Sequence, residues 1–318
     1  MPSLPDSPFF LAPLPAAVFH ADYLEREVLA LHRANPAFFR EQIDLAHIDE
    51  LVTAVRIPPT NLNLAQDDTP LPLEDYCVGG NYVDKARVLA LHRAGATIIL
   101  RAVEQWSPRI NRVRIVAEEF FGCPCQVNVY ITPPSQKSTP PHWDTHDLVV
   151  MQIEGTKRWR LFRGARTLPL GDERFSIDQD AVGPAIQTIE LSAGDTLYLP
   201  RGVIHEPVAE TYSVHASIGI HTLRWQEVAE LALRLAAERE GSALRTAVAG
   251  AGGRIGCIEA DELAVTLDGE LLERARAIQR RRFEATRAVD LQGALVDFAC
   301  ETRREELSRE RAPMLEVA

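Results

Sequence analysis

The stretch PPHWDTHD, residues 140–147, carries two histidines and two carboxylates within its last six residues. Such groups bind metal ions, exchange protons or satisfy a turn, so three interpretations are open: a metal site, an acid–base site or a polar turn. His142 and Asp144 are two positions apart, and residues i and i+2 of an extended strand point to the same side. One imidazole and one carboxylate can therefore reach the same ion, although an HxD pair is weak evidence by itself.

His205 is the candidate for a third ligand. It follows an apolar run and a Pro-Arg-Gly turn in LPRGVIHEP, 63 positions after His142. Two histidines and one carboxylate on one face are the facial triad of non-haem iron(II) sites, whereas zinc more often takes three histidines or thiolates. We therefore predict a metal site at His142, Asp144 and His205. His146 is interpreted as a supporting or substrate-facing residue, and Asp147 as the end of a turn.

The composition is that of a globular protein. The chain has 318 residues, of which 46% are hydrophobic and 25% charged, and its net charge of −11 argues against general nucleic-acid binding. Its five cysteines are interpreted as reduced. The first residues lack the basic segment and apolar run of a secretion signal, and no run approaches the ~20 apolar residues of a membrane span. We expect a cytoplasmic protein with no membrane or nucleic-acid partner.

The chain divides into three parts by pattern. Residues 1–121 are predicted to be a helical and strand extension that completes the core. Residues 122–223 contain short alternating apolar runs separated by Gly, Pro, Asp and Ser, which is typical of a β-sandwich or small barrel. Residues 224–318 are rich in Ala, Leu, Glu and Arg and are predicted to be helical.

Within the first part, the apolar spacing predicts helices over 21–39, 43–55 and 108–121, the last ending at Gly122. The two prolines of RIPPTNLNL, residues 56–64, favour an extended segment. Residues 82–106 are predicted to join a short helix to a strand.

A family resemblance becomes specific at the central motifs. The run from Asn128 to Phe162, followed by GDTLYLPRGVIHEP and SVHASIGIHTL, closely resembles the JmjC-domain cupin oxygenases of the ribosomal-oxygenase type, over roughly residues 20–225. The resemblance implies a mainly β core with helices, a double-stranded β-helix of the jelly-roll or cupin kind. It also implies Fe(II), 2-oxoglutarate as cosubstrate and O2, with His142, Asp144 and His205 as the iron ligands. A homodimer formed by the C-terminal region is implied as well.

Lys157 is unusual because it lies on an apolar strand face. In KRWRLF, Lys157, Trp159 and Leu161 alternate with two arginines, so the three share one face. A buried ammonium is costly unless it is paired, and that face carries no carboxylate locally. A bound dicarboxylate would supply the partner, and the resemblance implies that Lys157 anchors 2-oxoglutarate. The alternative is a lysine that reaches solvent.

Three further residues are predicted to bind the cosubstrate. Asn128 and Tyr130 share the polar face of a strand whose other face is β-branched, and Asn128 matches a cosubstrate-contacting position of the family. Tyr130 is equally compatible with a half-buried strand aromatic. Ser217 shares its strand face with His215 and His221, a second set of polar groups typical of a cavity wall.

The resemblance implies an Fe(II)- and 2-oxoglutarate-dependent dioxygenase that hydroxylates a side-chain carbon of an amino acid in a protein or peptide. A free amino acid or small natural-product intermediate is an alternative substrate. An N-methyl demethylase, which releases formaldehyde, and a non-catalytic cupin binding protein are further alternatives. The sequence contains no nucleophile elbow, Walker A loop or GxGxxG fingerprint, so other common chemistries lack a motif.

Overall fold

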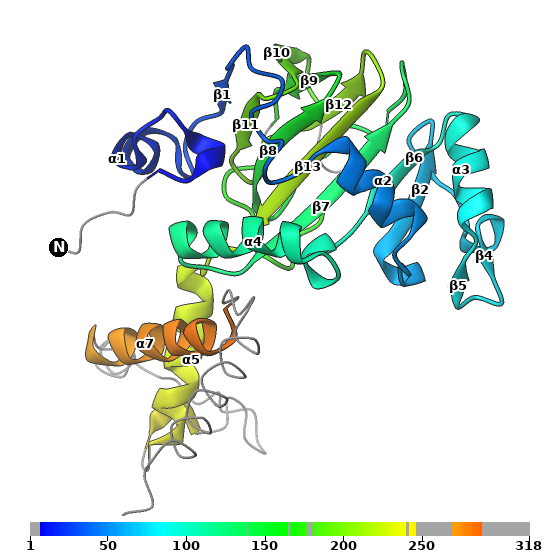
Figure 1. Ribbon diagram of the computed structural model, residues 1–318. Helices are drawn as coiled ribbons and strands as arrows, with labels where there is room; N and C mark the ends of the chain where they lie inside the picture. The colour runs from blue at the N-terminus through cyan, green and yellow to red at the C-terminus, as the bar shows by residue number, and fades with distance from the viewer. Residues whose placement is uncertain are drawn as a thin grey trace, which may run out of the picture. The chain divides into compact units, whose positions relative to one another are not determined.

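The computed structural model describes residues 7–137, 139–164, 166–176, 180, 182–239, 242–245 and 269–287. Two facing antiparallel sheets form its centre, and helices lie across the outer face of the larger one (Figure 1).

The larger sheet has eight strands in the order β1-β11-β8-β13-β7-β6-β2-β3. Four of these strands come from residues 1–121, so this segment forms part of the same sheet as the central motifs. The bounds are β1 Leu29–Leu31, β2 Leu62–Gln66, β3 Thr69–Pro70, β6 Thr97–Leu100, β7 Cys125–Thr132, β8 Asp147–Glu154, β11 Thr196–Leu199 and β13 Ser213–Ile220.

The smaller sheet has three strands in the order β10-β9-β12, and a short hairpin stands apart from both. The bounds are β9 Thr156–Phe162, β10 Ala185–Ser192 and β12 His205–Ala209, with the hairpin formed by β4 Cys77–Val78 and β5 Tyr82–Val83. The alternating apolar runs of residues 122–223 therefore fold into the β core that was predicted.

Strand alternation creates two separate cores. Val214, Ala216 and Ile218 of β13 pack toward the helices, whereas Leu148 of β8 and Trp159 of β9 belong to a second cluster between the sheets. Because successive side chains point to opposite faces, the polar positions of β7 and β13 also face the space between the sheets.

The predicted helices of the first part form with the end signals that the sequence carries. Asp44 caps α2 by accepting from the His47 N–H at 2.8 Å, and Ser107 caps α4 by accepting from the Ile110 N–H at 3.2 Å. Gly122 ends α4 with a φ of 66°, a left-handed conformation that favours glycine. The bounds are α1 Ala16–Val18, α2 Leu45–Thr53, α3 Lys85–Arg93 and α4 Pro108–Phe121, with short turns of helix at Phe9–Leu11, Phe19–Tyr23, Pro59–Asn61, Leu73–Asp75 and Val103–Gln105.

The helix predicted over 21–39 is wrong. After the short turn Phe19–Tyr23, the chain becomes extended, and Leu29–Leu31 pairs with β11 as an edge strand. The Arg33 guanidinium then donates to the carbonyls of Ala12, Gly194 and Phe10 at 2.7 to 2.9 Å. These contacts with distant segments stabilise the extended conformation more than the local apolar spacing stabilises a helix.

Two helices represent the C-terminal part among the described residues. Val228, Leu231 and Ala232 of α5 (Trp225–Glu238) form a small core with Leu271 and Ala275 of α7 (Gly269–Thr286). A short helical turn, Ala243–Arg245, lies between them in sequence. The helices predicted elsewhere in 224–318 fall on residues outside the described ones. No helix in the described part of the chain is long and apolar enough to cross a membrane.

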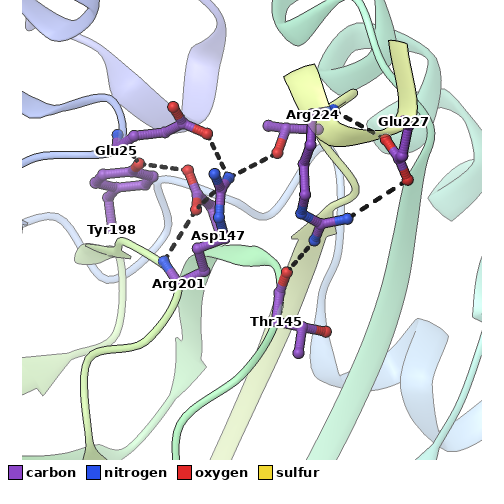
Figure 2. Close-up of polar contacts among 8 residues, drawn as sticks. Glu25, Thr145, Asp147, Tyr198, Arg201, Arg224 and Glu227 are labelled. Atoms are coloured by element: carbon purple, nitrogen blue, oxygen red, sulfur yellow. Dashed lines mark hydrogen bonds and ion pairs between the residues drawn. The ribbon is translucent and has the colours of Figure 1, made fainter. Parts of the chain in front are cut away.

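A buried ionic network fastens the start of β8 (Figure 2). Asp147 is fully buried and accepts from the Tyr198 hydroxyl at 2.7 Å and from the Arg201 N–H at 2.9 Å. The Arg201 guanidinium contacts Glu25 and donates to Thr222 at 2.8 Å. The interpretation of Asp147 as a simple turn end is therefore wrong, because its carboxylate joins β8, β11 and the segment before β12.

A second contact in the same region involves the first turn of α5. The Arg224 guanidinium donates to the Thr145 carbonyl, and the Arg224 N–H donates to the Glu227 carboxylate at 2.9 Å (Figure 2). The segment that carries His142 and Asp144 is thus held at its end by Asp147 and from the side by Arg224.

Replacing Asp147 with alanine removes the acceptor of two buried donors and leaves Arg201 with a single, partly exposed carboxylate partner. We expect the free energy of unfolding in urea to fall by about 3 kcal/mol. Glu210→Ala is the matched control, because Glu210 pairs with Arg158 at an exposed site, where such pairs contribute under about 1 kcal/mol. Equal small losses in both variants would contradict the structural role of Asp147.

Candidate metal centre and its cavity

The three predicted ligands meet at one point. The ligand atoms of His142, Asp144 and His205 all lie within 4.8 Å of one another. The Oδ2 atom of Asp144 is 3.9 Å from Nε2 of His142 and 3.7 Å from Nε2 of His205. Within the described residues, no other group of three or more His, Cys, Asp or Glu side chains is close enough to share an ion.

Backbone hydrogen bonds set this geometry. The His142 N–H donates to the His205 carbonyl at 3.2 Å, and the His205 N–H donates to the His142 carbonyl at 2.9 Å, an isolated antiparallel bridge. The Gly202 N–H donates to the Asp144 carbonyl at 3.0 Å. The separation of 63 residues is therefore closed by direct pairing of the two ligand-bearing segments.

The second nitrogen of each imidazole also has a hydrogen-bond partner. Nδ1 of His142 is 2.8 Å from the Pro140 carbonyl, and Nδ1 of His205 is 2.9 Å from the Val203 carbonyl. A carbonyl oxygen only accepts, so both Nδ1 atoms carry the proton and both Nε2 atoms present a lone pair. The tautomer needed for metal binding is thus fixed by the backbone.

Electrostatics favour the same protonation states. Burial and the neighbouring His142 lower the pKa of His205 to about 4, so this ring is neutral at physiological pH. Burial opposes ionisation of Asp144, but the imidazoles of His205 and His142 outweigh it and hold the pKa of the carboxyl below its usual range. The cluster therefore presents a neutral imidazole at His205 beside the carboxylate of Asp144.

The three side chains open into a cavity of about 280 Å³ between the two sheets. Its wall is mostly polar and comes from β7, β8, β9, β12 and β13. The other lining residues are Arg101, Gln126, Asn128, Tyr130, Thr139, His146, Leu148, Trp159, Pro207, His215, Ser217, Gly219 and His221.

Three of the residues predicted to bind a cosubstrate lie in this wall and contact one another. Tyr130 lies opposite His215, and Asn128 lies opposite Ser217, in the pairing of β7 with β13. The Asn128 Oδ1 accepts from the Ala102 N–H at 3.0 Å and from Gln126 at 2.9 Å. The side chains thus form a pre-oriented polar ladder across β7 and β13.

Lys157 lies behind the wall rather than in it. Its side chain is fully buried, and its Nζ is 3.1 Å from the Thr132 hydroxyl and 3.2 Å from Nδ1 of His215. No carboxylate of the described residues forms an ion pair with it. Burial lowers the pKa of Lys157 to about 7. Lys157 is thus buried without a carboxylate partner among the described residues, as predicted. It does not line the cavity itself, but it contacts His215, which does.

His146 faces the cavity, in agreement with its interpretation as a supporting or substrate-facing residue. Its ring stacks obliquely on His221 with centroids 4.9 Å apart. Gly219 makes room for it, because a Cβ there would lie 2.9 Å from the His146 ring. Trp143 lies between His142 and Asp144 in the sequence. It is buried, its ring centroid is 6.2 Å from that of Phe175, and it does not line the cavity.

Arg101 and Gln126 belong to the wall but were not identified from the sequence. Arg101 directly follows β6 and has no ion-pair partner in the described part of the chain. It belongs to no spacing motif, and the pairing of β6 with β7, in which Leu100 lies opposite Val129, brings Arg101 to this wall. The strand register would have been needed to find it.

The comparisons with known proteins agree with this arrangement. Residues 102–228 match the JmjC domain family. The protein named bifunctional lysine-specific demethylase and histidyl-hydroxylase NO66 of Drosophila melanogaster is 29% identical over 226 residues, which are 67% of this chain and 33% of that protein. Ribosomal oxygenase 2 of Rattus norvegicus is 28% identical over 236 residues, 68% of this chain and 48% of its own. This chain therefore spans less than half the length of these relatives.

The fold has a counterpart among solved structures. The X-ray structure of the Escherichia coli protein YcfD aligns with a TM-score of 0.51 at 17% sequence identity, covering 83% of this chain and 71% of that one. This likeness concerns the fold alone, and it agrees with the cupin fold implied by the central motifs. Residues 102–228 are therefore similar to the JmjC domain, and the chain is similar in sequence to proteins named as ribosomal oxygenases.

Proposed function

We propose that this protein is an Fe(II)- and 2-oxoglutarate-dependent dioxygenase that hydroxylates a side-chain carbon of an amino acid within a protein or peptide. One observation carries the proposal: a three-residue ligand cluster opens into a cavity whose wall lies against a buried lysine, and no carboxylate of the described residues pairs with that lysine. A metal face with free positions and a site for an anion are the two things that an oxo-dicarboxylate cosubstrate requires.

The donor set fits iron(II). His142, Asp144 and His205 would hold the ion through two Nε2 atoms and one carboxylate oxygen, the facial arrangement that leaves positions for cosubstrate and O2. When bound, iron supplies the oxygen chemistry, in which 2-oxoglutarate is oxidised to succinate and CO2 while one oxygen atom enters the substrate C–H bond. The chain holds the ligands in one tautomer and surrounds them with a partly enclosed cavity.

The polar wall divides into two sides. Lys157 of β9 provides the positive charge for the cosubstrate, and Asn128, Tyr130 and Ser217 are further cosubstrate contacts. Arg101, Gln126, His146 and His221 line the remaining wall and would receive the substrate side chain.

The printed names of the relatives support a protein substrate, because they describe a ribosomal oxygenase and a histidyl-hydroxylase. The first relative is also named a lysine-specific demethylase, which keeps N-methyl demethylation as a second candidate. A free amino acid remains an alternative because the cavity is small, about 280 Å³. The complete ligand set argues against a non-catalytic cupin.

We also propose a cytoplasmic homodimer assembled through the C-terminal helices. Trp225 of α5 is 65% exposed, and Leu223 beside it is 43% exposed, which leaves an apolar surface next to the α5–α7 core. The net charge of −11 disfavours a nucleic-acid partner.

Asp144→Ala removes the only carboxylate of the predicted triad. We expect iron binding by the anaerobic protein to weaken by one to two orders of magnitude, and iron-dependent succinate formation to be lost, because a carboxylate ligand fixes the charge and geometry of such sites. Metal titration and a succinate assay measure the two effects. Asp172→Ala, at an exposed position, is the control. Unchanged metal affinity in Asp144→Ala would refute the triad.

Lys157→Ala tests the anion site. The substitution removes the buried charge of β9, so the KM for 2-oxoglutarate should rise by roughly ten- to a hundredfold, the effect of losing a charge-assisted hydrogen bond. Arg158→Ala is the control on the same strand, since Arg158 points to the opposite face and pairs with Glu210. If the KM rises equally in both variants, Lys157 has no special role.

The reaction itself is tested by mass spectrometry of candidate peptides and free amino acids incubated with Fe(II), 2-oxoglutarate and ascorbate. We expect a product heavier by one oxygen atom and an equal amount of succinate. Formaldehyde release with loss of a methyl group would identify a demethylase instead. Succinate formation without any change in the substrates would contradict hydroxylation of this class.

A further inference from the structure

We propose that Arg101 recognises a carboxylate of the substrate, so that the preferred substrate is an anion. The carboxylate is either the acidic side chain of a peptide residue or the α-carboxylate of a free amino acid. The inference rests on the proposed function and names the substrate class of the same site. It also disfavours cationic targets, including the lysine named for one of the relatives.

The first argument is position. Ile98 and Leu100 of β6 pack into the core on the helix side of the larger sheet. Because side chains alternate along a strand, Ile99 and Arg101 face the space between the sheets. Arg101 lines the cavity of about 280 Å³ that also contains the three candidate ligands. Since both border one small cavity, a single amino-acid side chain can contact Arg101 and approach the ligands.

The second argument is the charge balance of the wall. Among the described residues, Asp144 is the only carboxylate that lines the cavity, and it belongs to the ligand cluster. The Arg101 guanidinium forms no ion pair with the described residues, whereas Arg160 pairs with Glu206. A substrate carboxylate can accept two parallel hydrogen bonds from this guanidinium. A lysine or arginine side chain would instead meet a like charge.

The third argument is a backbone that is already fixed. The Arg101 N–H donates to the Asn61 carbonyl at 2.8 Å, and the Asn61 side-chain amide donates to the Arg101 carbonyl at 3.0 Å. Ala102 follows with a φ of 50°, and its N–H donates to Oδ1 of Asn128 at 3.0 Å. Such left-handed residues persist where surrounding contacts hold them, and they cluster at ligand sites. The base of the Arg101 side chain is therefore held in place, which lowers the entropic cost of binding.

The fourth argument is that the Arg101 charge acts inside the cavity and is separate from the cosubstrate's cation. Burial and the Asp144 carboxylate raise the pKa of the Tyr130 hydroxyl, and the Arg101 charge opposes this rise. Lys157, the cation proposed for the cosubstrate, is on β9 of the smaller sheet, whereas Arg101 follows β6 of the larger one. Arg101 is thus a second cation that is available to the substrate.

Anaerobic calorimetric titrations of the protein loaded with Fe(II) and 2-oxoglutarate test the substrate class without turnover. One set of probes is a series of short blocked peptides whose central residue is aspartate, glutamate, asparagine, glutamine, leucine, lysine or arginine. The other set is the free amino acids and their amides. We expect probes with a carboxylate to bind about tenfold more tightly than their uncharged counterparts, as for a charge-assisted hydrogen bond at a partly exposed site.

Substitutions of Arg101 test the residue directly. Arg101→Gln should raise the dissociation constant of the carboxylate probes about tenfold. Arg101→Glu should reverse the preference, so that the lysine and arginine peptides bind more tightly than the aspartate peptide, a gain that misfolding cannot produce. Arg87→Gln is the control, because Arg87 is an exposed arginine of α3 that pairs with Asp84 outside the cavity. An equal loss of 2-oxoglutarate affinity in Arg101→Gln would place Arg101 in the cosubstrate site and overturn the inference.

The two sources of the carboxylate give different results. Preference for the aspartate or glutamate peptide identifies an acidic side chain, whereas binding of a free amino acid but not of its amide identifies an α-carboxylate. Equal binding of all probes, binding by none of them or tightest binding of a cationic peptide would refute this inference alone. A wild-type protein that binds neither iron nor 2-oxoglutarate would refute the proposed function itself.

Discussion

The pair of backbone hydrogen bonds between His142 and His205 is the constraint on which the site depends. It joins the loop before β8 to the start of β12 and so places two imidazoles from distant parts of the chain with centroids 4.6 Å apart. Carbonyls of Pro140 and Val203, each two residues before a ligand, then fix the ring tautomers. The arrangement of the candidate ligands thus depends on backbone pairing.

Two buried charged residues, Asp147 and Lys157, have different surroundings in this protein. Asp147 accepts hydrogen bonds from Tyr198 and Arg201, so its carboxylate links β8 to β11 while burial raises its pKa. Among the described residues, the polar contacts of Lys157 are instead a hydroxyl and an imidazole, and burial lowers the pKa of Lys157 to about 7. A buried charge with hydrogen-bonding partners stabilises the fold, whereas a buried charge without an opposite charge beside a cavity supports the anion site that we propose.

The sequence was informative wherever a short spacing implied one face. The two-residue step from His142 to Asp144 and the alternation around Lys157 both correspond to real strand geometry. It was less informative where contacts between distant segments determine the secondary structure. Residues 21–39 have helical spacing, but pairing of β1 with β11 makes part of them a strand. Arg101 can be recognised as a cavity residue only from the pairing of β6 with β7.

The same limit applies to His215. Its position on a polar strand face was evident from alternation, but its contact with Lys157 requires the packing of the large sheet against the small one. Local pattern predicts which face a residue occupies, and only the tertiary structure shows what that face meets. The chemistry of the cavity arises from this second level, because its wall combines residues of five strands.

X-ray absorption spectroscopy of the anaerobic Fe(II)-loaded protein tests the central claim most directly, which is that three protein side chains hold the ion and leave an open face. We expect two imidazoles and otherwise oxygen ligands, with the number of imidazoles unchanged when 2-oxoglutarate is added. A third imidazole, from His146 or His221, would mean that the open face is closed by the protein and would contradict the account.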